Sequence, residues 1–346
     1  MQDIKKAHLH WSCDADPGIT REPSGKHWRY RDTKGRVIRD AKTIERINHI
    51  GIPPAWKNVW ICPSPSGHMQ ATGKDAKGRT QYRYHARWRE VRDATKFHKL
   101  ELFAKHLPII RKHVTAHLHL PHLSHEKMIA TVVRLLDITH MRIGNEMYEH
   151  ENHSYGLTTL LDRHVHVHGA EVRFQFRGKS GQDQDVTLRD RTLARIILAC
   201  EELPGHFLFQ YIDHKGALHP VTSDHVNEYL HAITREPLSA KDFRTWGATV
   251  QAALSLLHLG ETDNERERAS RITRAVSEAA QALGNRPATC RKYYIDPRIL
   301  HAYNKSRLCP SLERYLHRSK NTGDTLHPLE KGVLNVITHQ TYSMDN

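Results

Sequence analysis

The sequence predicts an α+β protein of two domains, a small β-rich domain followed by a larger, mainly α-helical one. With 346 residues, 38% of them hydrophobic, the chain is long enough for two domains that each have a core. Up to about residue 90, glycines and prolines recur every few residues between short strand-like runs. From residue 91 onward, apolar residues recur at spacings of three and four, which is typical of helices. We therefore expect domains at residues 1–90 and 91–346.

The β-rich domain is indicated by three stretches with many turn residues. They read PSGKHWRYRDTKGRVIRD, GIPPAW and VWICPSPSGHMQATGKDAKGRTQYRYH. The same domain carries most of the excess positive charge. Residues 1–90 hold 18 Lys and Arg against 9 Asp and Glu, while the rest of the chain holds 34 against 29, within a formal net charge of +14. Such a basic domain favours a polyanionic partner, and nucleic acid is the first candidate.

The larger domain has helical patterns with one β interlude. ATKFHKLELFAKHLPIIRKHV and SHEKMIATVVRLLDITHMRIG predict helices, and alternating residues between Gly-rich turns at about 155–188 predict a three-stranded meander. ERERASRITRAVSEAAQALG predicts a helix that stops at Gly284. Asp296 is expected to cap a further helix whose first residue is Pro297. After a polar segment from about residue 301, LHPLEKGVLNVITH predicts a terminal packing helix.

Composition excludes several classes of protein. The five cysteines are widely spaced and include no CxxC pair, so neither a disulfide framework nor a zinc site is predicted. No apolar run has the length of a signal peptide core or of the ~18 residues of a membrane span, so we expect a cytoplasmic protein. His164, His166 and His168 are expected to share one face of a strand, where imidazoles without a neighbouring carboxylate or thiolate are typical of polar surface. Asp183 and Asp185 fit a polar hairpin end, and no clustered acidic pair indicates magnesium, so no metal or other cofactor is expected.

The stretch RKYYIDPRIL at residues 291–300 points to covalent chemistry. Its second tyrosine, Tyr294, follows two cations and lies at a junction between two predicted helices. A phenol with a pKa of about 10 is mostly protonated at neutral pH, so a nucleophilic tyrosine needs nearby cations or a base. Attack on a phosphodiester also needs guanidinium groups for the phosphate oxygens and an acid for the leaving oxygen. Arg142, Lys179 and Arg244 are candidates for these tasks.

The motifs around these residues resemble the poxvirus-type type IB DNA topoisomerases and their bacterial relatives. In order along the chain they are GIPPAW, GKDAKGRTQYRYH, MRIGNEMY, YGLTTL, FRGKSG, KDFRTWGAT and LGNRPATCRKYY, which together cover roughly residues 50–295. The resemblance implies that a tyrosine attacks one DNA strand to form a 3′-phosphotyrosyl link and a free 5′-hydroxyl. The duplex then swivels, and the 5′-hydroxyl reseals the strand. It also implies a bilobed clamp with duplex DNA between the lobes, and a catalytic fold shared with tyrosine recombinases.

Carried onto matching positions, the resemblance assigns the catalytic roles. Tyr294 is the nucleophile, Arg142 and Arg244 bind the phosphate, and Lys179 protonates the 5′-oxygen. Where the poxvirus pattern has a histidine, nine residues before the tyrosine, this chain has Asn285, which can donate a neutral hydrogen bond to phosphate but cannot carry a positive charge or act as an acid-base group. Tyr293 is expected to pack as part of a helix.

Five further residues match family positions that touch DNA in the major groove. In a strand, the side chains of Tyr82 and Tyr84 point to one face and those of their neighbours to the other, so QYRYH can present either face to a groove, or pack its tyrosines on the core. The resemblance favours DNA contact. At one of the five positions the poxvirus pattern has a lysine where this chain has Asn145. The five residues are Gln81, Tyr82, Tyr84, Asn145 and Tyr148.

Two other functions remain open at the level of sequence. A tyrosine recombinase shares the Arg, Lys, Arg and Tyr set, but it usually has a histidine where this chain has Lys241, and an all-helical front domain. A non-catalytic DNA-binding protein would fit the charge of residues 1–90, but has no need for a phenol at position 294. We therefore expect a monomeric topoisomerase in the cytoplasm, associated with the nucleoid, that acts on duplex DNA without ATP, metal or a small-molecule substrate.

Overall fold

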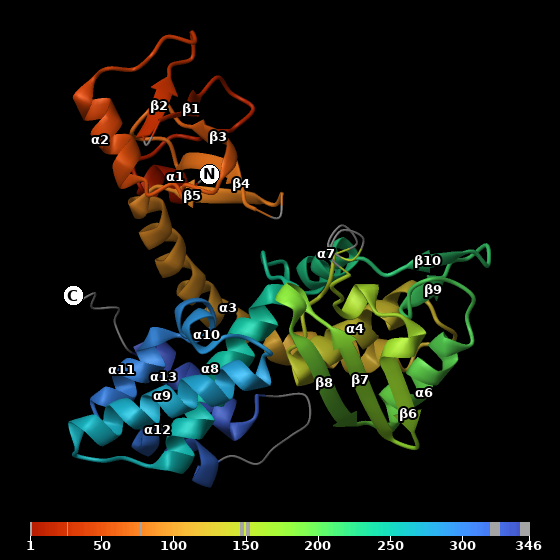
Figure 1. The fold of residues 1–346 in the computed structure, drawn as a ribbon. Coiled ribbons are helices and arrows are strands. Elements are labelled where there is room, and N and C mark those ends of the chain that lie inside the picture. The colour runs from red at the N-terminus through yellow and green to blue at the C-terminus, as the bar shows by residue number, and fades with distance from the viewer. Residues whose placement is uncertain are drawn as a thin grey trace. The chain divides into compact units, whose positions relative to one another are not determined.

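The computed structural model describes residues 2–25, 27–76, 78–145, 149, 153–318 and 326–339. The chain forms two compact units, Met1–His98 and Lys99–Asn346. The first is built on a β-sheet and the second is mainly helical, which confirms the predicted α+β class (Figure 1).

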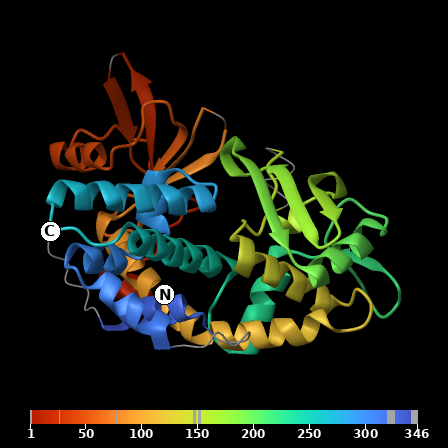
Figure 2. The same ribbon diagram turned by 90° about the horizontal axis from the view of Figure 1, so that it is seen from below.

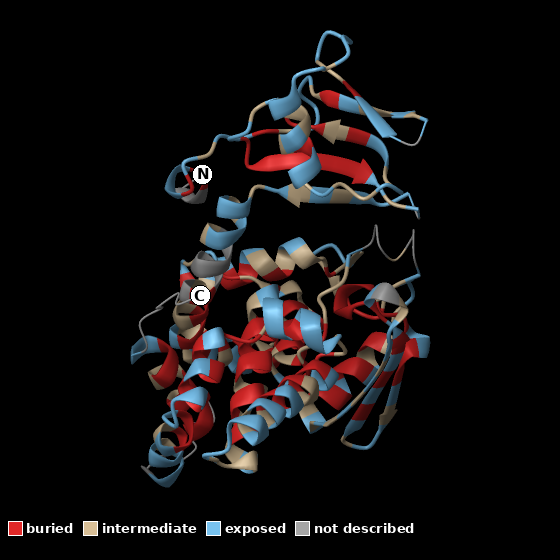
Figure 3. Ribbon diagram, turned by 60° about the vertical axis from the view of Figure 1, so that its left-hand side comes forward, coloured by how far each residue is buried: buried red, intermediate tan, exposed pale blue. Residues whose placement is uncertain are grey.

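The N-terminal unit is a five-stranded antiparallel sheet with two short helices. The strand order is β2-β1-β3-β4-β5, so β2 and β5 are the two edges. Strand β4 is buried along most of its length, and Ile19, Ile47 and Ile61 are among the residues of the core beside it (Figure 3). The elements are α1 (Gln2–Lys6), β1 (Ile19–Ser24), β2 (His27–Arg31), α2 (Ala41–His49), β3 (Lys57–Ile61), β4 (Met69–Lys74) and β5 (Thr80–Tyr84).

Helix α2 was not predicted, although its local signals are present in the sequence. The side chain of Asp40 caps the helix by accepting from the Thr43 N–H, and Ile47 on its inner face is buried.

A second difference concerns the connection between the units. Helix α3 (Ala86–Leu118) runs without a break through residues 90 and 91, where the sequence predicted the domain boundary, and it also continues through Pro108.

The second unit combines a helical bundle with a small β-meander. The meander, β6 (Val165–His168), β7 (Glu171–Arg177) and β8 (Asp183–Arg189), has the order β6-β7-β8 and confirms the predicted three strands. Helix α6 packs against β6 and β7 (Figure 1). The remaining elements are α4 (His125–Thr139), η1 (Leu157–Thr159), η2 (Asp162–His164), η3 (Lys179–Gly181), α6 (Arg191–Glu201), β9 (Gln210–Ile212), β10 (Leu218–Pro220), α7 (Ser223–Thr234), α8 (Ala240–Leu259), α9 (Glu265–Ala282), α10 (Pro287–Tyr293), α11 (Pro297–Asn304), α12 (Leu308–Arg318) and α13 (Pro328–His339).

Helix α8 is the central element of this unit. It contacts α4, α7, α9, α11, α12 and α13, and lies side by side with α9 (Figure 2).

The predicted stop of α9 is confirmed, because Gly284 adopts a left-handed conformation with φ of 57° just after the helix. The predicted terminal helix is confirmed as α13. Helix α12 lies in the segment from about residue 301 that was expected to be polar, and its proline is in the first turn, where a helix tolerates it.

The histidine stretch does not form the expected strand face. His164 belongs to η2 and is buried, with its ring nitrogen accepting from the Leu161 N–H, whereas His166 and His168 are exposed on β6. No group of three His, Cys, Asp or Glu residues in the described part of the chain could hold a metal ion. None of the described helices combines the length and apolar character needed to cross a bilayer.

Candidate active site

Tyr294 lies in the turn between α10 and α11, as predicted. Its N–H donates to the Cys290 carbonyl at 2.9 Å, and the Asp296 side chain caps α11 through the Arg298 N–H at 2.9 Å. Thr249 on α8 fixes this turn from the other side, because its hydroxyl oxygen accepts from the Asp296 N–H at 3.0 Å and lies 3.2 Å from the Tyr294 carbonyl oxygen. The backbone that carries the phenol is therefore held against the central helix.

Arg244 on α8 faces this phenol. Its guanidinium carbon lies 5.3 Å from the centre of the Tyr294 ring, and its side chain is almost completely buried. One terminal nitrogen donates to the His140 carbonyl, and the other donates to the Leu283 carbonyl at 2.9 Å. Its Nε is buried, and no described residue accepts a hydrogen bond from it. The carbonyls thus fix the guanidinium while one donor stays available.

Arg142 and Asn285 meet although 143 positions separate them in the chain. Nη2 of Arg142 donates to Oδ1 of Asn285 at 2.5 Å. Asn285 follows Gly284, so the turn that ends α9 presents its amide to the site. The Nδ2 of Asn285 is a buried donor with no acceptor among the described residues. Asn285 therefore orients Arg142 with its oxygen and keeps its N–H groups for another acceptor.

Two glycines let the backbone carrying Arg142 pack closely. Gly144 has a φ of 101°, which disfavours other residues. A Cβ built on Gly156 would lie 2.5 Å from the Gly144 nitrogen and 2.8 Å from the Arg142 carbonyl oxygen. The glycines of MRIGNEMY and YGLTTL thus serve the close approach of these two segments.

The charges of the site favour an anion. Burial opposes ionisation of the Tyr294 phenol, but Arg244 and Arg142 outweigh it and lower the pKa of that phenol. Burial, together with the charge of Arg142, lowers the pKa of Arg244 to about 10. Among the described residues, neither arginine forms an ion pair with a carboxylate. Two positive charges therefore surround the phenol without a counter-ion.

Lys179 lies in η3, at the tip of the β7–β8 hairpin, and is exposed. The hairpin reaches the Asn285 turn through Gln184. A Cβ on Gly284 would lie 2.4 Å from the Gln184 amide, and a Cβ on Gly178 would lie 3.0 Å from the Gln184 Cγ. The residue before Lys179 and the residue before Asn285 thus pack against the same side chain.

Tyr293 does not pack as expected. Its side chain is 44% exposed on α10, and the Lys292 ammonium lies 5.5 Å from its ring centre. The two adjacent tyrosines therefore differ in environment, because Tyr293 is partly exposed while Tyr294 has the buried Arg244 guanidinium against its ring.

The predicted DNA-contact residues of the first unit lie on the edge strand β5. Tyr82 and Tyr84 are 49% and 37% exposed, and their rings stack with centres 6.1 Å apart, so they do not pack into the core. Gln81 points to the other face and donates to Asp75 at 3.0 Å. In the second unit Asn145 is exposed, and Tyr148 lies outside the described residues.

Comparison with known proteins identifies the family. The model of the catalytic core of eukaryotic DNA topoisomerase I matches residues 85–309, and the model of the N-terminal domain of bacterial DNA topoisomerase IB matches residues 27–75. The chain belongs to the type IB DNA topoisomerases, enzymes that relax DNA by cleavage and religation. This confirms the predicted family and activity, in preference to a recombinase or a non-catalytic binding protein.

Two curated relatives show how far the similarity extends. DNA topoisomerase 1B of Acanthamoeba polyphaga mimivirus is 32% identical over 296 residues, which cover 84% of this chain and 88% of that protein. DNA topoisomerase 1 of Mycosarcoma maydis is 27% identical over 176 residues, 46% of this chain and 17% of that protein.

Sequence reasoning missed two residues that support the site. His140 ends α4 in a left-handed conformation and offers its carbonyl to Arg244, and its ring lies so close to α8 that a Cβ on Gly247 would be 2.5 Å from it. Thr249 is a polar residue on a buried face of α8. The signals available for them were Gly247, which makes room for the His140 ring, and Thr249, a polar residue at a buried position of α8.

Proposed function

We propose that Tyr294 is the nucleophile of this topoisomerase and that Arg142, Arg244 and Asn285 bind the scissile phosphate. Its phenol oxygen attacks phosphorus, the bond from phosphorus to the 5′-oxygen breaks, and the DNA remains attached through a 3′-phosphotyrosyl ester. The phenol proton passes to solvent, and Lys179 supplies a proton to the departing 5′-oxygen. In religation the 5′-hydroxyl attacks the ester and Tyr294 leaves.

The observation that carries this proposal is the pair of buried donors without an acceptor among the described residues. Arg244 Nε and Asn285 Nδ2 belong to side chains whose other polar atoms are fixed by hydrogen bonds. Buried donors are normally satisfied, and leaving one unpaired costs about 1–3 kcal/mol. An enzyme that stabilises the negative charge of a transition state holds its hydrogen-bond donors in place before the substrate binds, and these donors then have no acceptor yet.

The N-terminal unit is proposed to hold duplex DNA through the exposed face of β5. The excess positive charge of residues 1–90 and the exposed tyrosines support this role, and residues 91–346 then form the catalytic domain. The protein is proposed to act as a monomer in the cytoplasm, on nucleoid DNA, with no small-molecule substrate.

The mechanism predicts that supercoiled plasmid is relaxed without ATP and in excess EDTA. The phosphotyrosyl ester conserves the energy of the phosphodiester bond, and Lys179 takes the place of a metal at the leaving group. Gel electrophoresis of plasmid topoisomers provides the measurement. Tyr294→Phe protein purified in parallel controls for contaminating enzymes, and a strict magnesium requirement for cleavage would contradict the mechanism.

The DNA-binding role of the sheet predicts separate effects for aromatic and cationic residues. We expect Tyr82→Ala and Tyr84→Ala to weaken DNA binding at every salt concentration, because they remove contacts without charge. Lys74→Ala, on the neighbouring strand, should reduce the slope of log affinity against log salt by about 0.9, the value for one lost phosphate contact. Lys34→Ala, after the opposite edge strand β2, is the matched control. Equal slopes for both lysine variants would mean that the β5 edge does not face phosphates.

A further inference from the structure

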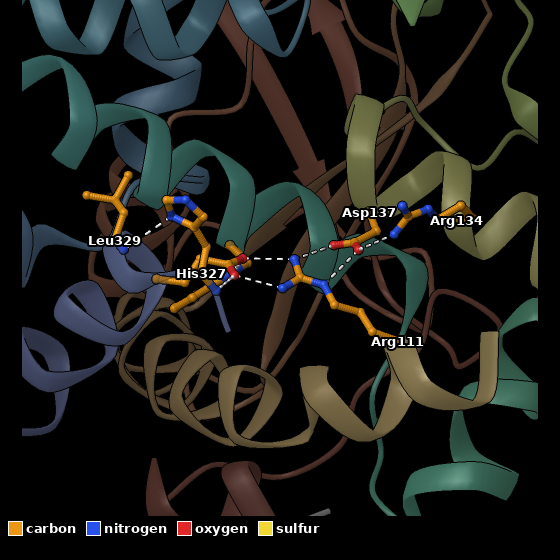
Figure 4. Close-up of polar contacts among 7 residues, drawn as sticks. Arg111, Arg134, Asp137, His327 and Leu329 are labelled. Carbon is orange, nitrogen blue, oxygen red and sulfur yellow. Dashed lines mark hydrogen bonds and ion pairs between the residues drawn. The ribbon is translucent and has the colours of Figure 1, made fainter. Parts of the chain in front are cut away.

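A buried ion network joins helices α3, α4, α8 and α13 (Figure 4). Arg111 on α3 donates to both oxygens of Asp137 on α4 at 2.9 and 3.0 Å, and to both oxygens of Glu330 on α13 at 2.7 and 2.9 Å. Trp246 on α8 donates its indole N–H to Glu330 at 3.0 Å. A single carboxylate from the C-terminal helix therefore connects three other helices.

The network reaches the segments that carry both proposed phosphate-binding arginines. Trp246 is two residues after Arg244, which places the two side chains on different faces of α8. Asp137 is three residues before His140, the residue whose carbonyl accepts from Arg244, and five residues before Arg142. Any shift of α4 relative to α8 changes the spacing of the two guanidinium groups.

The same C-terminal helix also supports the nucleophile. Arg298 on α11 donates to the Ile337 carbonyl near the end of α13 at 2.5 Å, and pairs with the buried Asp296 at 2.7 Å. Asp296 is two residues after Tyr294. Helix α13 thus contacts α8, which carries Arg244, through Glu330 near its start, and α11, which follows Tyr294, through Ile337 near its end.

The network contains two arginines and two carboxylates, because Arg134 also pairs with Asp137 at 4.0 Å, while Glu330 pairs with Arg111 at 2.7 Å. Asp137 alone already forms a bidentate pair with Arg111, so Glu330 is a second buried carboxylate. Burying it costs free energy, which the Arg111 hydrogen bonds offset. They hold the pKa of Glu330 below its usual range although burial opposes this. Glu330 adds a link between α4 and α8. It bonds to Arg111, which pairs with Asp137 on α4, and to Trp246 on α8.

We propose that α13 is a positioning element of the active site, in which Glu330 sets the distance between α8, which carries Arg244, and the end of α4, which leads into the segment that carries Arg142. The proposal rests on the phosphate-binding role assigned to these two arginines above. Glu330 does not touch DNA or the reacting atoms. It acts through the geometry of the guanidinium groups.

The test is Glu330→Gln, which keeps the size of the side chain and leaves Arg111 paired with Asp137. We expect single-turnover cleavage to slow about 10- to 100-fold, the loss expected for misplacement of a catalytic group by up to about 1 Å. DNA affinity, measured in the Tyr294→Phe background, should stay within about two-fold, because positioning acts on the transition state. Trp246→Phe removes the indole N–H together with part of the buried ring, and should slow cleavage in the same direction. Glu278→Gln, in the exposed pair with Arg274, should have none.

A double-mutant cycle separates positioning from loss of stability. If Glu330 acts through Arg244, Glu330→Gln should slow cleavage much less in an Arg244→Ala background, so the two effects are not additive. Additive effects, or a wild-type cleavage rate with only a lower Tm, would overturn the proposal. If Arg244→Ala itself cleaved at the wild-type rate, the assignment of Arg244 would fail, and this outcome is visible without the Glu330 variant.

Discussion

Tyr294→Phe is expected to abolish both the relaxation of supercoiled DNA and the covalent protein–DNA adduct. The substitution removes one hydroxyl, so there is no oxygen to form the ester, while the aromatic ring beside Arg244 remains. DNA affinity should therefore change little. Relaxation is followed on gels, the adduct by trapping with denaturant, and affinity by equilibrium binding to a short duplex.

Tyr293→Phe is the matched control for this variant. Tyr293 is the neighbouring residue, but it is 44% exposed on α10, whereas Tyr294 lies in the turn beside the buried Arg244, so its variant should relax DNA normally. An adduct that persisted in Tyr294→Phe and disappeared in Tyr293→Phe would show that the other tyrosine is the nucleophile.

Lys179→Ala is expected to slow cleavage by a factor of ~10²–10⁴, the range typical of a lost general acid, with little change in DNA affinity. The departing 5′-oxygen would then leave without a proton from the protein. A substrate with a bridging sulfur at the 5′ position of the scissile phosphate has a leaving group that needs no proton. On this substrate Lys179→Ala should cleave nearly as fast as the wild type.

Arg244→Ala distinguishes acid catalysis from phosphate binding in the same assay. Its buried guanidinium is proposed to stabilise charge on the non-bridging oxygens, which the sulfur does not change, so this variant should remain slow on both substrates. If the sulfur substrate failed to rescue Lys179→Ala, Lys179 would be a phosphate-binding residue, and Arg142 would be the next candidate for the acid.

Local signals in the sequence predicted those parts of the fold that depend on a few neighbouring residues. Alternation between Gly-rich turns predicted the β6–β8 meander, and Asp296 with Pro297 predicted the start of α11. Helix α2 was missed because it is a short helix among many turn residues. Helix α12 was missed because the segment from about residue 301 was interpreted only as polar.

Family motifs predicted the catalytic residues, but not how they are held. The hydrogen bond between Arg142 and Asn285 and the ion pair between Arg111 and Glu330 join segments 143 and 219 positions apart. Periodicity and spacing report on neighbours within one element, and so they contain no information about such contacts. The same limit applies to the Thr249 contact with Asp296, since it depends on the packing of α8 against the turn that carries Tyr294.

The central claim, that Tyr294 forms the covalent link to DNA, is tested most directly by locating that link in the wild-type protein. The adduct is trapped with denaturant in the presence of EDTA, digested with nuclease and trypsin, and fragmented by mass spectrometry. Cleavage after Lys292 and Arg298 gives a peptide that contains both Tyr293 and Tyr294, so the fragments must distinguish them. We predict a nucleotide joined by its 3′-phosphate to Tyr294. A nucleotide on Tyr293 or on any other residue, or one joined by a 5′-phosphate, would contradict the account.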